Sequence, residues 1–349
     1  MLGRWRAHGR QGTTRAAVVS AAVRAWQIHR NGPPREALRL VDVDDPVPGR
    51  GEVRLQVRAA AVGMPDAFMC RGSYAFRPAM PFVAGQEVCG VVDAVGDGVD
   101  VPLGTRLMAV TNFFDGRGGF AERTIARVES AFRVPDTMGD ADAASFRIGY
   151  STAWVGLVRR GALAAGDALL VLGAAGGSGT TAVLLGRALG ARVLAVVAGT
   201  EKLEVCRDLG ADVVIDRTAE SVPDAVLAAT DGRGADLVYD PVGGPVADAT
   251  VGCLARDGRL LAVGFASGRW VEPDVWALAR RNASVVGVYA GGYTWDENEA
   301  DHEALLALHA EGHLRSVATV VPFADLPDAV AAVDEGTAVG KLVVQTTTK

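Results

Sequence analysis

The chain has 349 residues, 49% of them hydrophobic and 22% charged, which is typical of a globular protein with room for two domains. Its formal net charge of −6 argues against a general nucleic-acid binder. No apolar run reaches the ~20 residues that span a bilayer, so no membrane partner is expected. The cysteines are scattered without a C-x-x-C pair, which favours a reduced, cytoplasmic protein over a disulfide framework or a clustered zinc site.

Residues 1–22 differ in composition from the rest, because they carry several arginines and the first acidic residue of the chain is Glu36. An arginine-rich segment without acids is typical of a transit peptide. A disordered tail, or translated sequence upstream of the true start, has the same composition. We expect a disordered extension and place the beginning of the fold at residue 23.

Residues 23–147 are predicted to form a β-rich module. A strand-like segment begins at Arg24, and apolar and polar residues alternate from Val53 to Arg58, as in a half-buried strand. Residues 88–95 and 106–110 are further strand candidates. Glycine-rich turns separate these short strands, a spacing that indicates a small barrel.

Residues 148–292 follow a different pattern, in which strands and helices alternate. A helix over 151–160 is expected to end at Gly161. Apolar strands are predicted at 168–173, 192–197, 213–216, 237–240, 259–264 and 285–289, and helices at 177–190, 201–209, 221–230 and 245–256. Repeated β-α units with apolar strands predict a doubly wound parallel sheet, so the fold class is α/β.

The last segment, 293–349, is too short to form a domain. We predict helices at 299–311 and 325–334 and strands at 317–321 and 341–345. The simplest arrangement is a return of the chain to the N-terminal module.

The run from Leu169 to Gly179 is predicted to be a buried strand followed by a glycine turn and the start of a helix. Glycines allow the backbone to approach a phosphate, and the free N–H groups of a helix start attract negative charge. We therefore expect Ala175, Gly176, Gly177 and Ser178 to hold cofactor phosphates. Gly179 would let the helix pack closely on the strand.

With these motifs in order, the sequence resembles the medium-chain dehydrogenase/reductase superfamily, and within it the zinc-independent quinone oxidoreductase (zeta-crystallin-like) branch. The resemblance implies a GroES-like catalytic domain, a Rossmann domain, an active site in the cleft between them, NAD(P)H and commonly a homodimer. The matching stretches are Met80–Glu87, Gly118–Glu122, Ala174–Gly179, Gly210–Asp212, Tyr239–Gly244, Gly258–Phe265 and Gly340–Val343.

The resemblance and the residues after the second strand of the β-α series favour NADPH over NADH. That strand is followed by Ala198-Gly199-Thr200, where NAD enzymes usually place an acid. Lys202 and Arg217 would supply positive charge for a 2′-phosphate. Glu201 is expected to point to solvent. The family also implies that the nicotinamide carboxamide meets the backbone of Gly264, Phe265 and Ala266.

We expect no zinc. The first ligand position of zinc-dependent relatives falls near Gly63 and has no cysteine, and their Gly-His-Glu reads Gly85-Gln86-Glu87 here. Without a Lewis acid, the simplest reaction is hydride transfer to an acceptor that is already electrophilic, such as a quinone or an enone. The family often has Asn where Gly63 stands, so the usual acceptor preference is in doubt.

Candidate catalytic residues are Tyr74, Asp66 and Thr152. Tyr74 lies in a loop that lines the cleft in the family, and it is either a proton donor or an aromatic wall for the substrate. Asp66 matches a common aspartate that serves either proton transfer or structure. Thr152 resembles a residue that contacts the nicotinamide, and the alternative is a hydroxyl that satisfies backbone donors at a helix start.

The sequence therefore predicts an NADPH-dependent, zinc-free reductase of quinones or other α,β-unsaturated carbonyl compounds. An enoyl-thioester (enoyl-CoA) reductase of the same superfamily is the enzymatic alternative, and Arg71 and Arg77 leave it open because coenzyme A carries phosphates. A non-enzymatic NADPH-binding protein, like the crystallin relatives, is a further alternative. The apolar edge strand at 285–289 fits the homodimer that the family implies.

Overall fold

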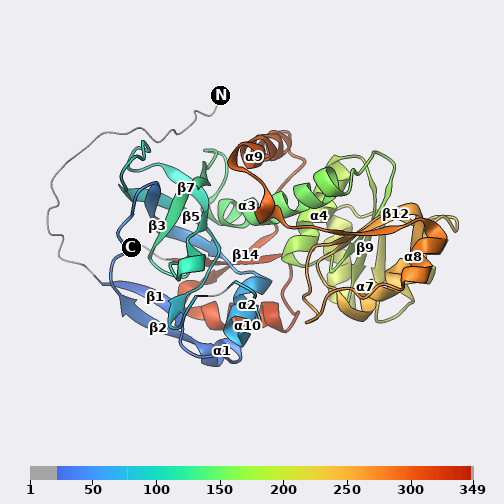
Figure 1. The fold of residues 1–349 in the computed structure, drawn as a ribbon, viewed down its shortest axis with the longest axis horizontal. Coiled ribbons are helices and arrows are strands. Elements are labelled where there is room, and N and C mark those ends of the chain that lie inside the picture. The colour runs from blue at the N-terminus through green and yellow to red at the C-terminus, as the bar shows by residue number, and fades with distance from the viewer. Residues whose placement is uncertain (1–21, 77, 347–349) are drawn as a thin grey trace. The chain divides into compact units, whose positions relative to one another are not determined.

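The computed structural model describes residues 22–76 and 78–346, and the predicted extension falls almost entirely outside them. The described residues form two compact units (Figure 1), one built from those up to Ile148 together with those from Ala318 onward, and the other from Gly149–Val317. The return to the first unit therefore begins at Ala318 and not at residue 293, so residues 293–317 belong to the second unit. Within the described ranges, no helix is long and apolar enough to cross a membrane.

The first unit is built around a closed ring of four antiparallel strands. In this ring β3 pairs with β5, β5 with β6, β6 with β7, and β7 again with β3. Val53, Leu55 and Val57 alternate along β3 and are fully buried, as the sequence pattern predicts. The strands of the unit are β1 (Val23–Ile28), β2 (Leu38–Val43), β3 (Glu52–Ala61), β4 (Phe82–Val83), β5 (Glu87–Val95), β6 (Arg106–Thr111), β7 (Arg123–Arg133), β14 (Ala318–Pro322) and β15 (Lys341–Gln345).

Short helices from both ends of the chain pack beside this barrel. α10 (Leu326–Asp334) contacts α1 (Pro34–Ala37) and α2 (Met64–Arg71), so the red and blue segments of Figure 1 lie side by side. Arg71 on α2 holds the carboxylate of Asp334 on α10 through two nitrogens, at 2.7 and 2.5 Å. The returning segment is thereby fixed to the barrel unit. The unit also contains the 3₁₀ turns Phe113–Asp115 and Phe323–Asp325.

The second unit contains a six-stranded, fully parallel sheet in the order β10-β9-β8-β11-β12-β13. The order reverses between β8 and β11, which is the switch point of a doubly wound sheet. Every residue of the central strand β8 is buried, as its apolar sequence predicts. The strands are β8 (Ala168–Leu172), β9 (Arg192–Val197), β10 (Val213–Asp216), β11 (Ala235–Asp240), β12 (Leu254–Ala262) and β13 (Ser284–Gly287).

The helices of this unit differ from the sequence prediction at four places. The helix predicted over 245–256 ends at Thr250 as α7, and the strand β12 already begins at Leu254. α8 lies in a stretch without a predicted element, α9 begins with a capping box between Thr294 and Glu297, and α3 begins eleven residues before the predicted Ser151. α3 runs across the boundary between the units and continues as the π-helical segment Val155–Arg160. The helices are α3 (Asp140–Trp154), α4 (Gly177–Ala188), α5 (Leu203–Asp208), α6 (Val222–Ala229), α7 (Gly244–Thr250), α8 (Val275–Arg281) and α9 (Trp295–Ala310), with 3₁₀ turns at Thr200–Lys202, Val251–Cys253 and Ala290–Gly292.

Candidate active site

The predicted glycine turn connects β8 to α4 in the second unit. Gly173 has φ +60°, a left-handed conformation that favours glycine, and the N–H of Gly176 closes the turn on the Gly173 carbonyl at 2.9 Å. A Cβ on Gly179 would come within 2.2 Å of that same carbonyl oxygen. The first turn of α4 therefore packs against the strand end at a distance that only glycine permits.

The start of α4 offers unsatisfied backbone donors at the carboxyl end of β8. The N–H of Thr180 bonds to the carbonyl of Gly176, whereas the N–H groups of Gly177, Ser178 and Gly179 have no partner among the described residues. Gly176 is the N-cap residue and has no side chain that could cap the helix. These donors fit the pyrophosphate of a dinucleotide, because they lie at the positive end of the helix dipole.

The hydroxyl of Ser178 points back into the sheet. It lies 2.9 Å from the hydroxyl of Tyr239, which belongs to a run of fully buried residues on β11. Burial raises the pKa of Tyr239 far above its usual value, so this phenol stays neutral. The contact fixes Ser178, and its backbone N–H remains available for a phosphate.

The loop after β9 carries the residues predicted to select the cofactor. Asp216, at the end of β10, accepts hydrogen bonds from Gly199 N–H at 3.2 Å and from the hydroxyl of Thr218 at 2.7 Å. These bonds hold the pKa of Asp216 below its usual value. Thr200 and Arg217 are exposed, and the charge of Arg217 acts on Asp216, although its guanidinium forms no hydrogen bond within the described residues. Lys202 is half-buried and already engaged by other groups.

Glu201 lies differently from the prediction that it points away into solvent. The residue is exposed, but its two carboxylate oxygens lie 2.7 and 2.8 Å from where a Cβ of Gly199 would stand. Gly199 has φ +93° and no side chain, so the carboxylate folds back over it. An acid is therefore present beside the end of β9, although it does not belong to the strand.

The Gly264–Ala266 segment follows β12, and fewer of its backbone N–H groups are available to a cofactor than predicted. The N–H of Gly264 bonds to the carbonyl of Asp240, and that of Ala266 bonds to Pro241. Two of its donors are thus used inside the unit, which leaves mainly carbonyl oxygens for a carboxamide. The ring of Phe265 lies 4.9 Å from that of Trp270, between centroids.

In the first unit, Asp66 is buried and bonded on both oxygens. One accepts the N–H of Gly63 at 2.8 Å, which caps α2, and the other accepts the N–H of Gly85 at 3.1 Å. Burial raises the pKa of Asp66 to about 6. This geometry supports the structural interpretation of Asp66, since the carboxyl joins two loops through their backbones.

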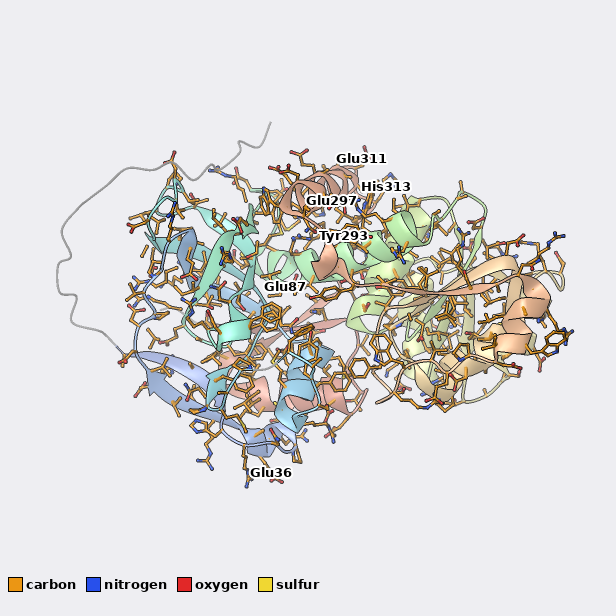
Figure 2. All side chains as sticks on the ribbon, in the orientation of Figure 1. Glu36, Glu87, Tyr293, Glu297, Glu311 and His313 are labelled. Carbon is orange, nitrogen blue, oxygen red and sulfur yellow. The ribbon has the colours of Figure 1, made fainter. Side chains whose placement is uncertain are left out.

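The buried Glu87 (labelled in Figure 2) and the half-buried Lys341 form a second polar group in the barrel unit. Glu87 Oε1 accepts the N–H of Ile148 at 2.7 Å, while Oε2 lies 3.7 Å from Lys341 Nζ. Burial raises the pKa of Glu87 above its usual value. The amide nitrogen of the neighbouring Gln86 is buried and has no hydrogen-bond partner among the described residues. The segment Gly85-Gln86-Glu87, which corresponds to a ligand segment of zinc-dependent relatives, thus carries an amide and a carboxyl group here. The ammonium group of Lys341 lies beside that carboxyl.

Tyr74 belongs to a chain of aromatic rings. Its ring lies 6.2 Å from that of Phe76, and Phe76 lies 5.8 Å from Phe114, both in edge-to-face geometry. Phe76 and Phe114 are exposed, whereas Tyr74 packs partly against the barrel core. These contacts favour an aromatic wall around Tyr74, and they leave proton donation as the other use of its hydroxyl.

Thr152 is not a helix-start residue. α3 begins at Asp140, with acidic residues in its first turn, so Thr152 lies close to the end of this helix. The prediction that its hydroxyl satisfies donors at a helix start is therefore wrong. The half-buried side chain is left with the nicotinamide contact that the resemblance implied, which stays a prediction.

Sequence reasoning missed Tyr239, Asp216 and Lys341 as site residues. Tyr239 and Asp216 each lie at the carboxyl end of an apolar strand, where ligands of parallel sheets bind. Lys341 precedes the last apolar strand and is a rare residue type in this chain. Within residues 22–76 and 78–346, no three His, Cys, Asp or Glu side chains converge as a metal site.

The chain was compared with known proteins. The family described as alcohol dehydrogenase GroES-like domain matches residues 49–136, and zinc-binding dehydrogenase matches residues 177–308. A quinone oxidoreductase-like protein 2 homolog from Nematostella vectensis is 34% identical over 248 residues, which are 70% of this chain and 67% of that protein. A mycocerosic acid synthase-like polyketide synthase from Mycolicibacterium smegmatis is 30% identical over 72% of this chain and 12% of its own length.

Solved structures agree with the sequence matches. A mycobacterial protein complexed with NADPH has a TM-score of 0.86 and 30% identity, and the match covers 93% of this chain and 100% of that one. The predicted GroES-like barrel and Rossmann-type sheet are confirmed, and so is the resemblance that the motifs carried. The chain therefore belongs to the medium-chain dehydrogenase/reductase superfamily and is an oxidoreductase of its quinone oxidoreductase branch.

Proposed function

We propose that this oxidoreductase uses NADPH, works without zinc, and reduces quinones or other α,β-unsaturated carbonyl compounds. The observation that carries the proposal is the start of α4, where three free N–H groups lie behind a turn that only glycine fits. A nicotinamide dinucleotide, when bound, supplies the hydride. Gly177 and Ser178 would hold its pyrophosphate through their N–H groups, and Tyr239 keeps Ser178 in place.

Arg217 supports NADPH over NADH, because its exposed guanidinium lies just beyond the end of β10 and forms no hydrogen bond within the described residues, although its charge acts on Asp216. The N–H of Arg217 bonds to the carbonyl of Val197, which brings the residue to the end of β9. A 2′-phosphate would give this guanidinium a charge-assisted partner. The relative solved with NADPH supports the same choice. Glu201 is the opposing group, since its carboxylate over Gly199 would repel a phosphate.

The donor set of the barrel supports a reaction without zinc. Zinc binds thiolate, imidazole and carboxylate ligands. Gly63 offers no ligand and Gln86 offers a neutral amide, so Glu87 would be the only strong ligand of the three positions. We expect full activity after dialysis against a chelator. Activity that disappears on chelation and returns with zinc would overturn this part of the proposal.

Steady-state NADPH oxidation over a panel of quinones, enones and enoyl-CoA thioesters tests the acceptor class. We expect turnover with quinones or enones. The polyketide synthase relative supports the enoyl-thioester alternative. Against it, Arg71 is engaged with Asp334 and is not free for a coenzyme A phosphate, and Arg77 lies outside the described residues. NADPH binding without turnover of any acceptor would indicate the crystallin-like alternative.

The same assay distinguishes the two roles considered for Tyr74, a proton donor and an aromatic wall. Tyr74→Phe keeps the ring contacts and removes only the hydroxyl. An aromatic wall predicts an unchanged kcat for this variant, whereas a proton donor predicts a fall of about 10²-fold or more. We favour the wall, because Tyr74 already packs in the chain of rings.

We also propose that two copies of the chain associate through β13. This strand is an edge of the parallel sheet, and no strand of the described residues covers its outer side. The nearby α8 exposes Val275 and Trp276, at 74% and 69%. Sedimentation equilibrium should give a dimer mass. A lysine in place of Val286 should shift the equilibrium to monomer, and a monomeric wild-type protein would contradict the proposal.

A further inference from the structure

Lys341 begins β15 and places in the barrel unit an ammonium group that forms a long ion pair with Glu87 but no hydrogen bond within the described residues. Its side chain is only 17% exposed, and the carboxylate it faces, Glu87, is 3.7 Å away, beyond hydrogen-bond reach. No hydrogen bond to this ammonium is formed within the described residues. A largely buried cation that keeps all its donors is costly unless something else accepts them.

The sheet register explains why Lys341 and Glu87 face each other. Val343 on β15, Ala61 on β3 and Glu87 on β5 lie in one row across three strands. Lys341 precedes Val343 by two residues, so both side chains share a face. β3 ends at Ala61, and Lys341 therefore lies beside the segment that follows, which contains Gly63.

Gly63 places no side chain between itself and this ammonium. A Cβ on Gly63 would stand 3.7 Å from Lys341 Nζ and 3.7 Å from Asp66 Oδ2. Its backbone, with φ −128° and ψ 165°, is extended and suits any residue. The backbone conformation thus does not require glycine, although a Cβ would meet Pro65 Cδ at 3.3 Å, and a side chain there would begin within contact distance of the lysine.

We propose that Lys341 Nζ is an oxyanion site, which binds the carbonyl oxygen of the acceptor. This inference rests on the proposed function and adds to it a residue that touches the substrate. Hydride addition forms a C–H bond and reduces the acceptor, and the displaced π electron pair arrives on the carbonyl oxygen. That oxygen takes a proton from the ammonium, and the neutral amine then regains a proton from water.

Lys341 is the cation that faces two acidic groups of the barrel unit. The titratable groups close to Lys341 are Glu87 and Asp66, and Arg147 acts on Glu87 from α3. Burial raises the pKa of both carboxyls, and the positive charge of Lys341 acts against this rise. Lys341 would in this way supply, from a side chain, the positive charge that zinc-dependent relatives take from a metal.

The test uses p-nitrophenolate, an aromatic oxyanion whose visible absorbance reports both binding and protonation, with the full chain and no dinucleotide. Wild-type protein should bind the anion and lower the pKa of the bound phenol. Gly63→Asn keeps every buried charge and should weaken binding about tenfold or more by covering the ammonium. Lys341→Arg should retain most of the affinity, and Arg256→Met, an exposed cation of the second unit, should change nothing.

Lys341→Met alone would leave two buried carboxyls without their cation, so it is combined with Glu87→Gln. A neutral pair in place of a buried ion pair is often tolerated. A double variant that unfolds normally and binds the anion about tenfold more weakly supports the proposal. A double variant or a Gly63→Asn variant that binds like wild type overturns it, as does a wild-type protein that fails to bind. Because no cofactor is present, inactivity toward every acceptor would count against the proposed function alone.

Discussion

The start of α4 and the group around Lys341 are two ways of building a place for negative charge. At α4, neighbouring residues of one short segment present backbone N–H groups, and glycines fix the geometry. Around Lys341, side chains come from β5, β15 and the first turn of α2, which are distant in sequence. The first is read from a contiguous motif, whereas the second exists only once the strands are in register.

The two arrangements also fail in different ways. Backbone donors survive most side-chain changes, so the α4 site is broken by added volume more than by lost chemistry. A buried charge group depends on each member, because removal of one leaves another unpaired. We therefore expect added side-chain volume to impair the α4 site most, and the removal of a polar or charged group to impair the group around Lys341 most.

The largest effect is expected for Gly179→Ala. Its Cβ would come within 2.2 Å of the Gly173 carbonyl and 2.6 Å of Ala174 Cα, which are backbone atoms that cannot rotate away. We expect a loss of about 3 kcal/mol in the free energy of unfolding and much weaker dinucleotide binding. Urea unfolding and fluorescence titration with NADPH measure both.

Gly176→Ala is the matched control for that variant. Gly176 has φ −86°, and a Cβ there would meet its nearest atom at 3.4 Å, an ordinary contact. The free energy of unfolding should change by less than about 1 kcal/mol. Equal destabilisation by the two substitutions would show that the close approach of α4 to β8 is not what requires glycine.

Asp66→Asn tests the polar region by removal of one acceptor. Both carboxyl oxygens accept backbone N–H groups, and an amide would place its NH₂ against one of these donors. The free energy of unfolding should fall by about 2 kcal/mol. No loss of stability would contradict the role of Asp66 as the link between Gly63 and Gly85.

The same variant gives a pH dependence with a defined sign. Burial raises the pKa of Asp66 in the folded state to about 6, so between pH ~4 and pH ~6 the folded protein holds a proton that the unfolded chain has lost. The stability advantage of wild type over Asp66→Asn should therefore shrink as pH rises through this window. An advantage that grows instead would mean that the two N–H bonds outweigh burial. Denaturant unfolding at several pH values decides this.

These regions also show what the sequence could predict. The apolar run before Gly173 and the small residues after it predicted β8, the turn and α4 correctly, because all the interactions involved are local. The strands β9 and β10 were predicted to the residue for the same reason. Thr152 was misplaced because the acidic start of α3 was read as part of a loop.

The contact between Lys341 and Glu87 in the barrel could not be predicted from local sequence patterns. Lys341 and Glu87 are far apart in the chain, and only the pairing of β15 with β3 and of β3 with β5 brings their side chains to one face. Glu201 is a local example of the same limit. Its helix position suggested solvent, but the left-handed Gly199 gave its carboxylate a place to fold back.

A smaller effect is expected for variants of the residues that select the cofactor, which lie in the same unit as the start of α4. Arg217→Ala and Lys202→Ala should each raise KM for NADPH, by up to about tenfold, and leave KM for NADH unchanged. Glu201→Gln should act in the opposite sense, because it removes the carboxylate that a 2′-phosphate would meet. Steady-state kinetics with both dinucleotides provide the comparison, and equal effects on NADPH and NADH would contradict the assignment.

Tyr239→Phe is expected to have the smallest effect, and it asks whether the α4 site depends on a side chain at all. The variant removes the contact with the Ser178 hydroxyl, at 2.9 Å, and leaves the buried ring in place. It should cost about 1 kcal/mol of stability and raise KM for the dinucleotide only slightly. Ser178→Ala removes the same bond from the other side, so the double variant should cost little more than either single variant. If the two losses simply add, the contact is not what positions Ser178, and the backbone of the turn is sufficient.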